Sequence, residues 1–228
     1  MTEASTGPVR VVAIDGPSGS GKSTVARNLA ERLDLSYLDT GAMYRSVAFA
    51  ALRRNIDPSD TDTVVRLAEQ VEIVLDGSDV RVDGVDASIE IRGPEVTRAV
   101  SAVAANPGVR KEMVRRQREW ITSHGGGVVE GRDIGAVVWP DAEVKVYLTA
   151  RLAVRADRRH KEVEDLAYES VAADMAARDT VDSTREASPL QLAPDALVID
   201  TTDHSVDEVV AMVMAQLSED ERPSEREA

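Results

Sequence analysis

Short apolar runs alternate with amphipathic helical patterns along most of the chain. The apolar runs predict strands, and apolar residues repeated at intervals of three and four predict helices between them. Short apolar strands separated by helices are typical of a parallel sheet that is covered on both faces. We therefore expect an α/β protein with a five-stranded parallel sheet, whose strands lie at about 9–15, 36–39, 127–130, 143–148 and 196–200.

Helical patterns fill the intervals between these strands. Pro107 marks the start of one helix, because proline is favoured in the first turn. Thr40 fits the N-cap of another. The predicted helices lie at about 21–33, 40–54, 61–70, 94–105, 107–123, 151–162, 166–179 and 206–217.

The pattern changes from helical to alternating between residues 71 and 86. Residues 71–75 and 79–83 alternate apolar with polar side chains, and a third short piece follows near Val85. Aspartate–glycine pairs occupy the two positions where the chain must turn. This segment predicts a small antiparallel sheet that is inserted between helices of the main domain.

The composition is that of a globular protein with an aliphatic core. Of 228 residues, 43% are hydrophobic, yet the chain has one Phe, two Trp and four Tyr. The net charge of −14 argues against a general nucleic-acid-binding protein, because such proteins carry basic surfaces. The sequence has no cysteine, no apolar run near the ~18 residues of a membrane span and no signal-peptide pattern. We therefore expect no membrane or nucleic-acid partner and a cytoplasmic location.

A glycine-rich stretch follows the first predicted strand and opens the first helix. It fits the pattern G-x-x-x-x-G-K-S, the P-loop, which binds nucleotide phosphates in this strand–loop–helix context. Glycines let the backbone curl so that its N–H groups face phosphate oxygens. The lysine adds a charge at the β- and γ-phosphates, and the serine hydroxyl is a ligand for Mg²⁺. The candidate ATP-binding residues are Gly16, Pro17, Ser18, Gly19, Ser20, Gly21, Lys22, Ser23 and Thr24.

Polar residues follow two further strands at the edge of the sheet where the P-loop lies. The second strand ends in Asp-Thr-Gly at 39–41, and the third ends in Glu-Gly-Arg-Asp at 130–133. Ligands of an open parallel sheet bind beyond the carboxyl ends of its strands. Helix capping would explain Asp39 or Thr40 about as well as ligand binding does. Asp39 and Glu130 are also candidates to order the water ligands of a metal ion.

The three histidines do not predict a metal site that the protein builds alone. His124, His160 and His204 lie far apart in the sequence, and no H-x-x-x-H pattern occurs. We expect the metal to be Mg²⁺ that arrives with ATP and is bound through the Ser23 hydroxyl.

A late predicted helix carries four arginines on one side. At about 100° per residue they fall within an arc of about 80°. Spacing alone slightly favours a solvent-exposed face that pairs with the glutamates at 162 and 164. The alternative is a cationic stripe that wraps a polyphosphate. The four residues are Arg151, Arg155, Arg158 and Arg159.

The sequence lacks the N-K-x-D motif of GTPases and the L-S-G-G-Q motif of transporter ATPases. An inserted sheet and a late arginine-rich helix instead favour a small-molecule kinase with an acceptor-binding insert and a mobile lid. Four ordered motifs resemble the bacterial cytidylate kinase family of P-loop nucleoside monophosphate kinases. They are IDGPSGSGKS at 14–23, LDTGAMYR at 38–45, EGRDIG at 130–135 and R-D-x-x-D-x-x-R-x-x-S-P-L at 178–190.

The resemblance spans about 9–217 and implies transfer of the γ-phosphoryl group of ATP to CMP or dCMP, in pyrimidine nucleotide metabolism. It implies a monomer, and it departs from the family at Glu130, where the family often has aspartate. The implied sites are Lys22, Arg132, Arg155, Arg158 and Arg159 for neutralising the transferred charge; Thr40, Arg45, Arg132 and Arg185 for the CMP phosphate; Ser101, Arg110 and Asp133 for cytosine; and Arg178 and Asp182 for the sugar.

Two other functions stay open at this stage. One is a kinase for UMP or another small phosphate acceptor, and the other is a nucleotide-binding regulator without enzymatic activity. The expected organisation is a flexible tail at 1–8, a kinase domain at 9–217 with an acceptor-binding insert at about 61–105 and a helical lid at about 151–185, and an acidic disordered tail at 218–228.

Overall fold

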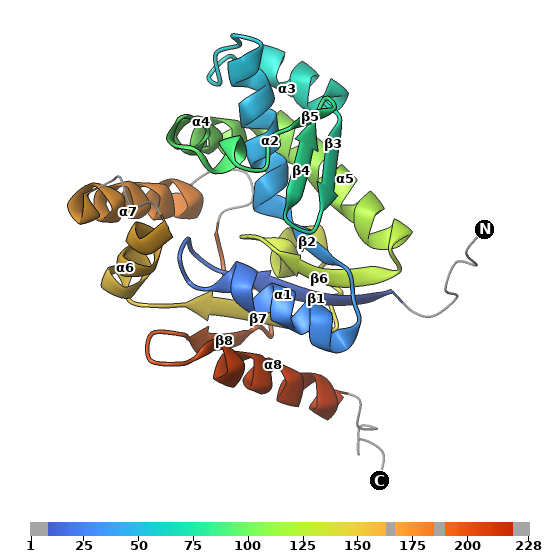
Figure 1. The fold of residues 1–228 in the computed structure, drawn as a ribbon. Helices are drawn as coiled ribbons and strands as arrows, with labels where there is room; N and C mark the ends of the chain where they lie inside the picture. The colour runs from blue at the N-terminus through green and yellow to red at the C-terminus, as the bar shows by residue number, and fades with distance from the viewer. Residues whose placement is uncertain (1–8, 163–166, 185–189, 221–228) are drawn as a thin grey trace.

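Five parallel strands form the centre of the molecule, as the apolar runs predict. The computed structural model describes residues 9–162, 167–184 and 190–220 (Figure 1). All neighbouring strands in this sheet run parallel, and each is separated from the next in the chain by at least one helix. Across the sheet the strands are β2 (Tyr37–Asp39), β6 (Gly126–Glu130), β1 (Arg10–Asp15), β7 (Val144–Thr149) and β8 (Leu197–Asp200).

Each predicted helix is present among the described residues, and the helices surround the sheet (Figure 1). They are α1 (Lys22–Leu33), α2 (Thr40–Arg53), α3 (Thr61–Gln70), α4 (Pro94–Ala105), α5 (Pro107–Ser123), α6 (Leu152–Glu162), α7 (Tyr168–Thr184) and α8 (Val206–Asp220).

The sheet separates two apolar cores, and β1 contributes to both. Val11 and Ala13 of this strand point into a core shared with α2 and α5. Val12 and Ile14 point the other way, into a core shared with α1 and α8. All four side chains are fully buried, as expected for alternate residues of a central strand with helices on both faces. The arrangement confirms the expected fold class.

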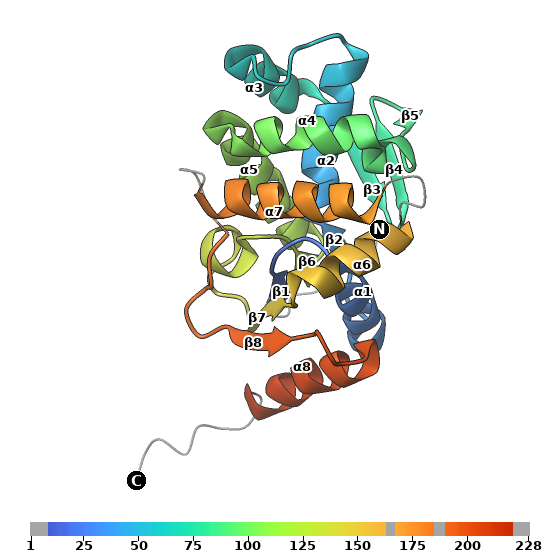
Figure 2. The ribbon, with the colours of Figure 1, turned by 90° about the vertical axis from the view of Figure 1, so that its left-hand side faces the viewer.

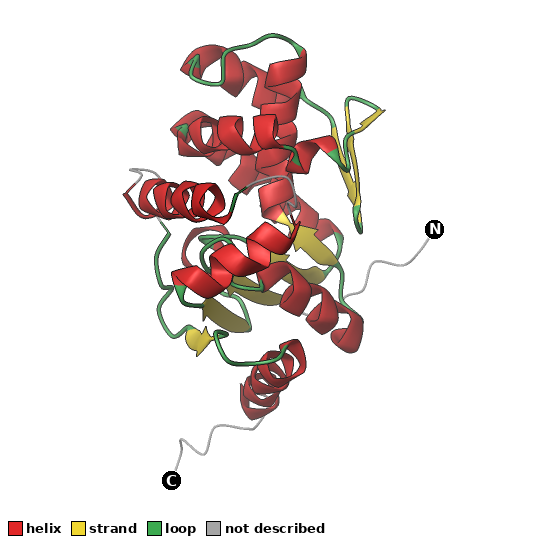
Figure 3. Ribbon diagram, turned by 60° about the vertical axis from the view of Figure 1, so that its left-hand side comes forward, coloured by secondary structure: helices red, strands yellow, loops and turns green. Residues whose placement is uncertain are grey.

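The alternating segment forms a separate antiparallel sheet, as predicted. Its strands are β3 (Ile73–Asp76), β4 (Asp79–Val82) and β5 (Val85–Asp86), in that order. Figure 3 shows this small sheet standing apart from the central one. Gly77 and Gly84 lie at its turns with φ angles of 59° and 73°, which glycine adopts at low cost.

Two short helical segments were not predicted. A 3₁₀ helix, η1 (Glu90–Arg92), follows β5, and a π-helical segment, η2 (Ile134–Val138), follows β6. The Asp15 carboxylate at the end of β1 accepts hydrogen bonds from the N–H groups of Ile134 and Gly135, each at 2.9 Å. A π-helix is rare and has no periodic apolar signature, so hydrophobic spacing does not reveal it.

Three expected helix boundaries are wrong. Asp39, not Thr40, is the N-cap of α2, because its carboxylate accepts the N–H of Ala42. The Thr40 hydroxyl instead donates to the carbonyl oxygen of Glu130 at 2.7 Å, which joins the ends of β2 and β6. Helix α7 spans Tyr168–Thr184, not 166–179, so Asp182 is helical. Helix α8 ends at Asp220, so the first residues of the expected tail are helical.

Helices α6 and α7 form a small unit over one edge of the sheet. Ala156 of α6 packs against Val171 and Met175 of α7 in an apolar cluster of their own. Figure 2 shows α7 crossing between α4 and the central sheet. Arg185 and Glu164, both singled out from the sequence, lie outside the described residues. Among the residues that are described, no helix is both long and apolar enough to cross a bilayer.

Candidate active site

A cavity of about 720 Å³ opens at the carboxyl ends of the central strands. This is the edge where an open parallel sheet binds its ligands. The cavity brings together most of the residues that the sequence singles out. Those that line it are Ser18, Gly19, Ser20, Gly21, Lys22, Ser23, Thr24, Thr40, Arg45, Ser101, Arg110, Arg132, Asp133, Arg158, Arg159, Arg178 and Asp182.

The P-loop is shaped by its own backbone. Gly16 and Gly19 have φ angles of 142° and 74°, which residues with a side chain rarely adopt. A Cβ atom on Gly16 would lie 2.0 Å from the carbonyl oxygen of Leu148, so no other residue fits there. The buried Ser20 hydroxyl donates to the carbonyl oxygen of Pro17 at 3.0 Å and closes the curl. Gly16 and Pro17 therefore shape the loop from behind, whereas the next residues line the cavity.

Lys22 lies almost fully buried at the start of α1. Its Nζ atom donates to the carbonyl oxygen of Pro17 at 2.8 Å. Burial, and then the nearby charge of Arg132, lowers the pKa of Lys22 to about 7. An anion in the cavity would favour the charged form of the lysine. The position therefore suits a phosphate group.

Ser23 and Glu130 form a set of oxygen donors beside Lys22. The Ser23 hydroxyl donates to Oε2 of Glu130 at 2.9 Å, and the Tyr37 hydroxyl donates to Oε1 of the same carboxylate. Burial, and then the charge of Asp39, raises the pKa of Glu130. Oxygen ligands suit Mg²⁺, and no group of three or more His, Cys, Asp or Glu side chains among the described residues could hold a metal. The donors fit a metal ion that arrives with a nucleotide.

Asp39 and Arg45 form a partly buried ion pair at the start of α2. An Arg45 guanidinium nitrogen lies 2.8 Å from Oδ2 of Asp39. Burial raises the pKa of Asp39, but Arg45, the Ala42 N–H and Arg92 together hold it below the usual range. Asp39 is engaged with these groups, whereas Glu130 is the acid that contacts Ser23.

Arg110 of α5 and Asp133 form a buried ion pair at the far side of the cavity. The two charged groups approach to 2.5 Å, and their side chains are 4% and 7% exposed. The Arg110 guanidinium also donates to the carbonyl oxygen of Ala104 at 3.3 Å and lies over the ring of Tyr44. This pair therefore presents one fixed acceptor and one fixed donor group to the cavity.

Helix α7 adds two charged residues that face Arg132. The Arg132 guanidinium donates to Oδ2 of Asp182 at 3.1 Å. Burial, and then the charge of Arg132, lowers the pKa of Arg178, whereas Asp182 opposes that shift. Arg178 and Asp182 share one face of α7, as their spacing of four residues requires in a helix.

The arginines of α6 are held by the protein, so the interpretation as a solvent-exposed face is wrong for two of them. Arg155 is 8% exposed and donates to the carbonyl oxygens of Ser18 and Ala150 and to Asp179. Arg158 donates to the carbonyl oxygen and the hydroxyl of Thr201. Arg158 and Arg159 line the cavity, and Arg155 lies behind it.

Comparison with known proteins identifies the family. A sequence profile of the cytidylate kinase family matches residues 12–219. The chain belongs to the cytidylate kinase family. A cytidylate kinase of Mycobacterium avium is 51% identical over 208 residues, which cover 88% of this chain and 91% of the relative. One of Bacillus velezensis is 46% identical over 211 residues, which cover 89% of this chain and 94% of the relative.

Solved structures agree on the fold alone. A shikimate kinase from Acinetobacter baumannii superposes with a TM-score of 0.50 at 14% identity, covering 94% of this chain and 96% of its own. Membership of the cytidylate kinase family makes this chain a kinase. The P-loop kinase fold expected from the sequence is confirmed.

Three residues that line or support the cavity of this cytidylate kinase family member were not singled out as such from the sequence. Asp15 lies beneath the P-loop, and burial raises its pKa to about 6. Tyr37 holds Glu130, and Arg92 reaches the cavity from η1. An acidic residue at the end of an apolar strand was the available signal for Asp15. Nothing in local spacing marks Tyr37 or Arg92, because Glu130 and Asp39, the carboxylates that they contact, lie far away in the sequence.

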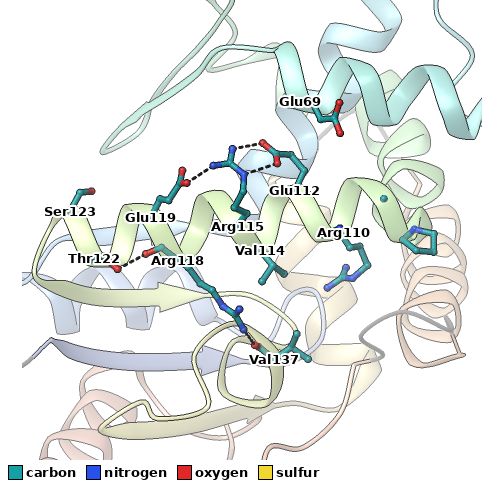
Figure 4. Close-up of a pocket in the computed structure, with 13 residues that line it drawn as sticks. Glu69, Arg110, Glu112, Val114, Arg115, Arg118, Glu119, Thr122, Ser123 and Val137 are labelled. Carbon is teal, nitrogen blue, oxygen red and sulfur yellow. Dashed lines mark hydrogen bonds and ion pairs between the residues drawn. The ribbon is translucent and has the colours of Figure 1, made fainter.

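A second, open groove of about 970 Å³ runs along the outer side of α5. Figure 4 shows Glu112, Arg115 and Glu119 joined along this helix, with Arg118 reaching the carbonyl oxygen of Val137. These charges are satisfied within the protein. The cavity beside the P-loop is therefore the better candidate for the active site, although it has the smaller volume.

Proposed function

We propose that this chain transfers the γ-phosphoryl group of ATP to CMP and dCMP, giving ADP with CDP or dCDP. The observation that carries the proposal is that one cavity contains both the P-loop lysine and the Arg110–Asp133 pair. Cytosine has an amino donor at N4, which suits the Asp133 carboxylate, and acceptors at N3 and O2, which suit the Arg110 guanidinium. Ser101 lines the same region of the cavity from α4.

The reaction needs no general base from the protein. The second pKa of a phosphate monoester is about 6, so the acceptor oxygen is already ionised at neutral pH. That oxygen attacks the γ-phosphorus of ATP, the bond to the bridging oxygen of the β-phosphate breaks, and ADP leaves with the electron pair. Catalysis then consists of positioning and of neutralising the charge on the transferred group.

The cationic side chains of the cavity supply that neutralisation. Lys22 is placed for the β- and γ-phosphates of ATP. Arg132 lies close enough to lower the pKa of Lys22, so it would contact the phosphate groups of both substrates. Arg158 and Arg159 approach from the lid helix α6. The Arg155 guanidinium donates a hydrogen bond to the carbonyl oxygen of Ser18 in the P-loop. Arg155 would therefore reach a nucleotide only if the lid helix α6 moved.

Ser23 and Glu130 would hold Mg²⁺, which arrives with ATP. Their oxygens, 2.9 Å apart, are the donor chemistry that this ion prefers. When bound, the ion offsets negative charge on the β- and γ-phosphates. Glu130 accepts hydrogen bonds from Ser23 and Tyr37, so its carboxylate is oriented before a ligand arrives.

The acceptor is held by groups on both sides of the cavity. Thr40, Arg45 and Arg132 bind its phosphate, and Arg178 and Asp182 bind its sugar hydroxyls. All five line the cavity. We also assign Arg185 to the phosphate, by family resemblance alone. Because one chain supplies the donor and acceptor sides together, we propose a monomer as the active unit, which light scattering would test.

A turnover screen tests this proposal. Purified protein is mixed with ATP, Mg²⁺ and one of CMP, dCMP, UMP, AMP or GMP, and the diphosphate product is measured. We expect CMP and dCMP to be the preferred acceptors. A preference for UMP would support the kinase of different specificity. Nucleotide binding with no diphosphate formed from any acceptor would contradict enzymatic activity and support a regulator.

A further inference from the structure

An arginine of the inserted segment reaches the acceptor side of the cavity. Arg92 ends η1, and the preceding residue, Ile91, is fully buried and anchors this turn in the core. One guanidinium nitrogen of Arg92 donates to the carbonyl oxygen of Ser88 at 3.1 Å. Its side chain is 39% exposed and lines the cavity. Arg92 is therefore placed by the fold of the insert, with part of its guanidinium facing the cavity.

Asp39 lies between two arginines that come from different parts of the chain. Its Oδ2 atom is 2.8 Å from Arg45 and 3.7 Å from Arg92. The buried Nε atom of Arg45 has no hydrogen-bond partner in the structure. The Asp39 carboxylate therefore keeps two guanidinium groups close together, and the Nε donor of Arg45 stays unused.

This part of the cavity has an excess of positive charge that matches a phosphate monoester. Four arginines, at 45, 92, 132 and 178, face two carboxylates, at 39 and 182, and the four minus two leave two positive charges among these described residues. A phosphate monoester carries a charge of about −1.5 to −2 at pH 7. Guanidinium groups bind phosphate oxygens in pairs through their planar donors. One phosphate group would offset the two excess positive charges and accept hydrogen bonds from the guanidinium groups.

We propose that Arg92 binds the phosphate of the acceptor nucleotide, and that Arg92 and Arg45 transfer their contacts from Asp39 to that phosphate when the acceptor binds. This inference rests on the proposed function, because it names a further residue for the same acceptor. In the free protein Asp39 occupies the place between the arginines that the phosphate takes in the complex. In the complex, the phosphate would then link Arg92 of the insert to Arg45 of α2, as Asp39 does in the free protein.

The test compares acceptors with and without the phosphate. The dissociation constants of CMP and cytidine are measured by calorimetry, without ATP, for the wild type and for Arg92→Ala, Arg92→Lys and Arg81→Ala. Arg81 lies exposed on β4 of the same insert and does not line the cavity, so it is a matched control. We expect Arg92→Ala to weaken CMP binding about tenfold and to leave cytidine binding unchanged, because a charge-assisted hydrogen bond to the phosphate is lost.

Arg92→Lys keeps the charge without the planar donors, so we expect a smaller loss, again for CMP alone. Equal losses for CMP and cytidine would overturn the proposal, because Arg92 would then only support the fold. Unchanged CMP affinity in Arg92→Ala would overturn it as well. If that variant does not fold, the lysine variant decides by the same comparison. Binding is measured without turnover, so failure of the kinase activity itself appears separately, in the acceptor screen of the wild type.

Discussion

The two halves of the cavity are built in different ways. The donor half consists mainly of one contiguous stretch, 16–24, in which glycine backbone and a buried serine create the shape. The acceptor half is assembled from α2, η1, α4, α5, the end of β6 and α7. Its charged side chains are already paired with one another, as in Asp39–Arg45, Arg110–Asp133 and Arg132–Asp182.

This difference predicts that substitutions in the two halves have different effects on chemistry, substrate binding and stability. The loop of the donor half is shaped by its own backbone, so we expect a substitution of its polar side chains to affect the chemistry more than the fold. In the acceptor half, the paired side chains stabilise the fold and are also the proposed ligands of the acceptor. We therefore expect a substitution there to affect binding and stability together. The following predictions test that division, beginning with the largest expected effect.

Lys22→Ala tests the donor half. We expect kcat to fall by about 10³- to 10⁵-fold, the range for losing a group that neutralises charge in phosphoryl transfer. The free energy of unfolding should not decrease much, because the P-loop is shaped by its glycines and by Ser20. Steady-state rates with CMP and urea unfolding measure the two effects.

Lys161→Ala is the matched control, because this lysine is 72% exposed and pairs with Asp157, its neighbour on the surface of α6. It should leave both kcat and stability nearly unchanged. A Lys22→Ala variant that keeps most of its turnover would show that the donor half does not depend on this charge.

Asp133→Ala tests the acceptor half, where fold and binding should fail together. It leaves the buried Arg110 guanidinium without its carboxylate, which costs about 3–5 kcal/mol of stability. CMP affinity should fall as well, because the acceptor for the cytosine amino group is lost. Urea unfolding and calorimetry measure the two losses.

Asp203→Ala removes the carboxylate of an exposed ion pair, in which Arg151 is 67% and Asp203 82% exposed. It should cost no more than about 1 kcal/mol. If Asp133→Ala were as mild as this control, the acceptor half would not depend on its buried pair.

The same contrast explains what could be predicted from the sequence. The P-loop and the motif at 130–133 were found because contiguous residues carry their chemistry and apolar strands precede them. The sheet was predicted because short apolar runs recur between helices. The interpretation of the α6 face was wrong because spacing along one helix does not show that Asp179, 24 residues away, receives Arg155.

The residues that were missed all depend on distant partners. Tyr37 and Glu130 are 93 positions apart, and Asp15 and Ile134 are 119 positions apart. Arg92 reaches the cavity because Ile91 anchors a 3₁₀ turn in the core. Such contacts are set by how the elements pack, which periodicity and local motifs do not encode.

Asp15 joins the end of β1 to η2, and its titration predicts a pH-dependent stability. Burial raises its pKa from 3.8 to about 6, so the folded protein keeps a proton that the unfolded chain releases above about pH 4. Unfolding therefore releases a proton in this window, and the free energy of unfolding contributed by Asp15 falls as the pH rises. About two pKa units correspond to a loss of about 3 kcal/mol between pH 4 and pH 6.

Asp15→Asn isolates this contribution from the other carboxylates. The variant loses one acceptor for the N–H groups of Ile134 and Gly135, which gives an offset that does not depend on pH. We expect its stability relative to the wild type to improve by about 3 kcal/mol as the pH rises from 4 to 6. Urea unfolding at four pH values measures the difference, and a constant difference would contradict the raised pKa.

Tyr37→Phe should give the smallest effect, and it tests whether the donor half is fully independent of distant residues. The substitution removes the hydroxyl that donates to Oε1 of Glu130 but leaves the contact between Glu130 and Ser23. Partners that orient a metal-binding carboxylate affect metal affinity. We expect the Mg²⁺ concentration for half-maximal rate to rise about tenfold, with a smaller change in the KM for CMP.

Tyr168→Phe is a suitable control, because its hydroxyl donates to the carbonyl oxygen of Ala153 on α6, away from Glu130. It should leave the Mg²⁺ requirement unchanged. If Tyr37→Phe raised the KM for CMP as much as the Mg²⁺ requirement, the hydroxyl would support both halves through the shared end of β6. Glu130 would then belong to both halves, and the donor half would no longer be shaped by its own loop alone.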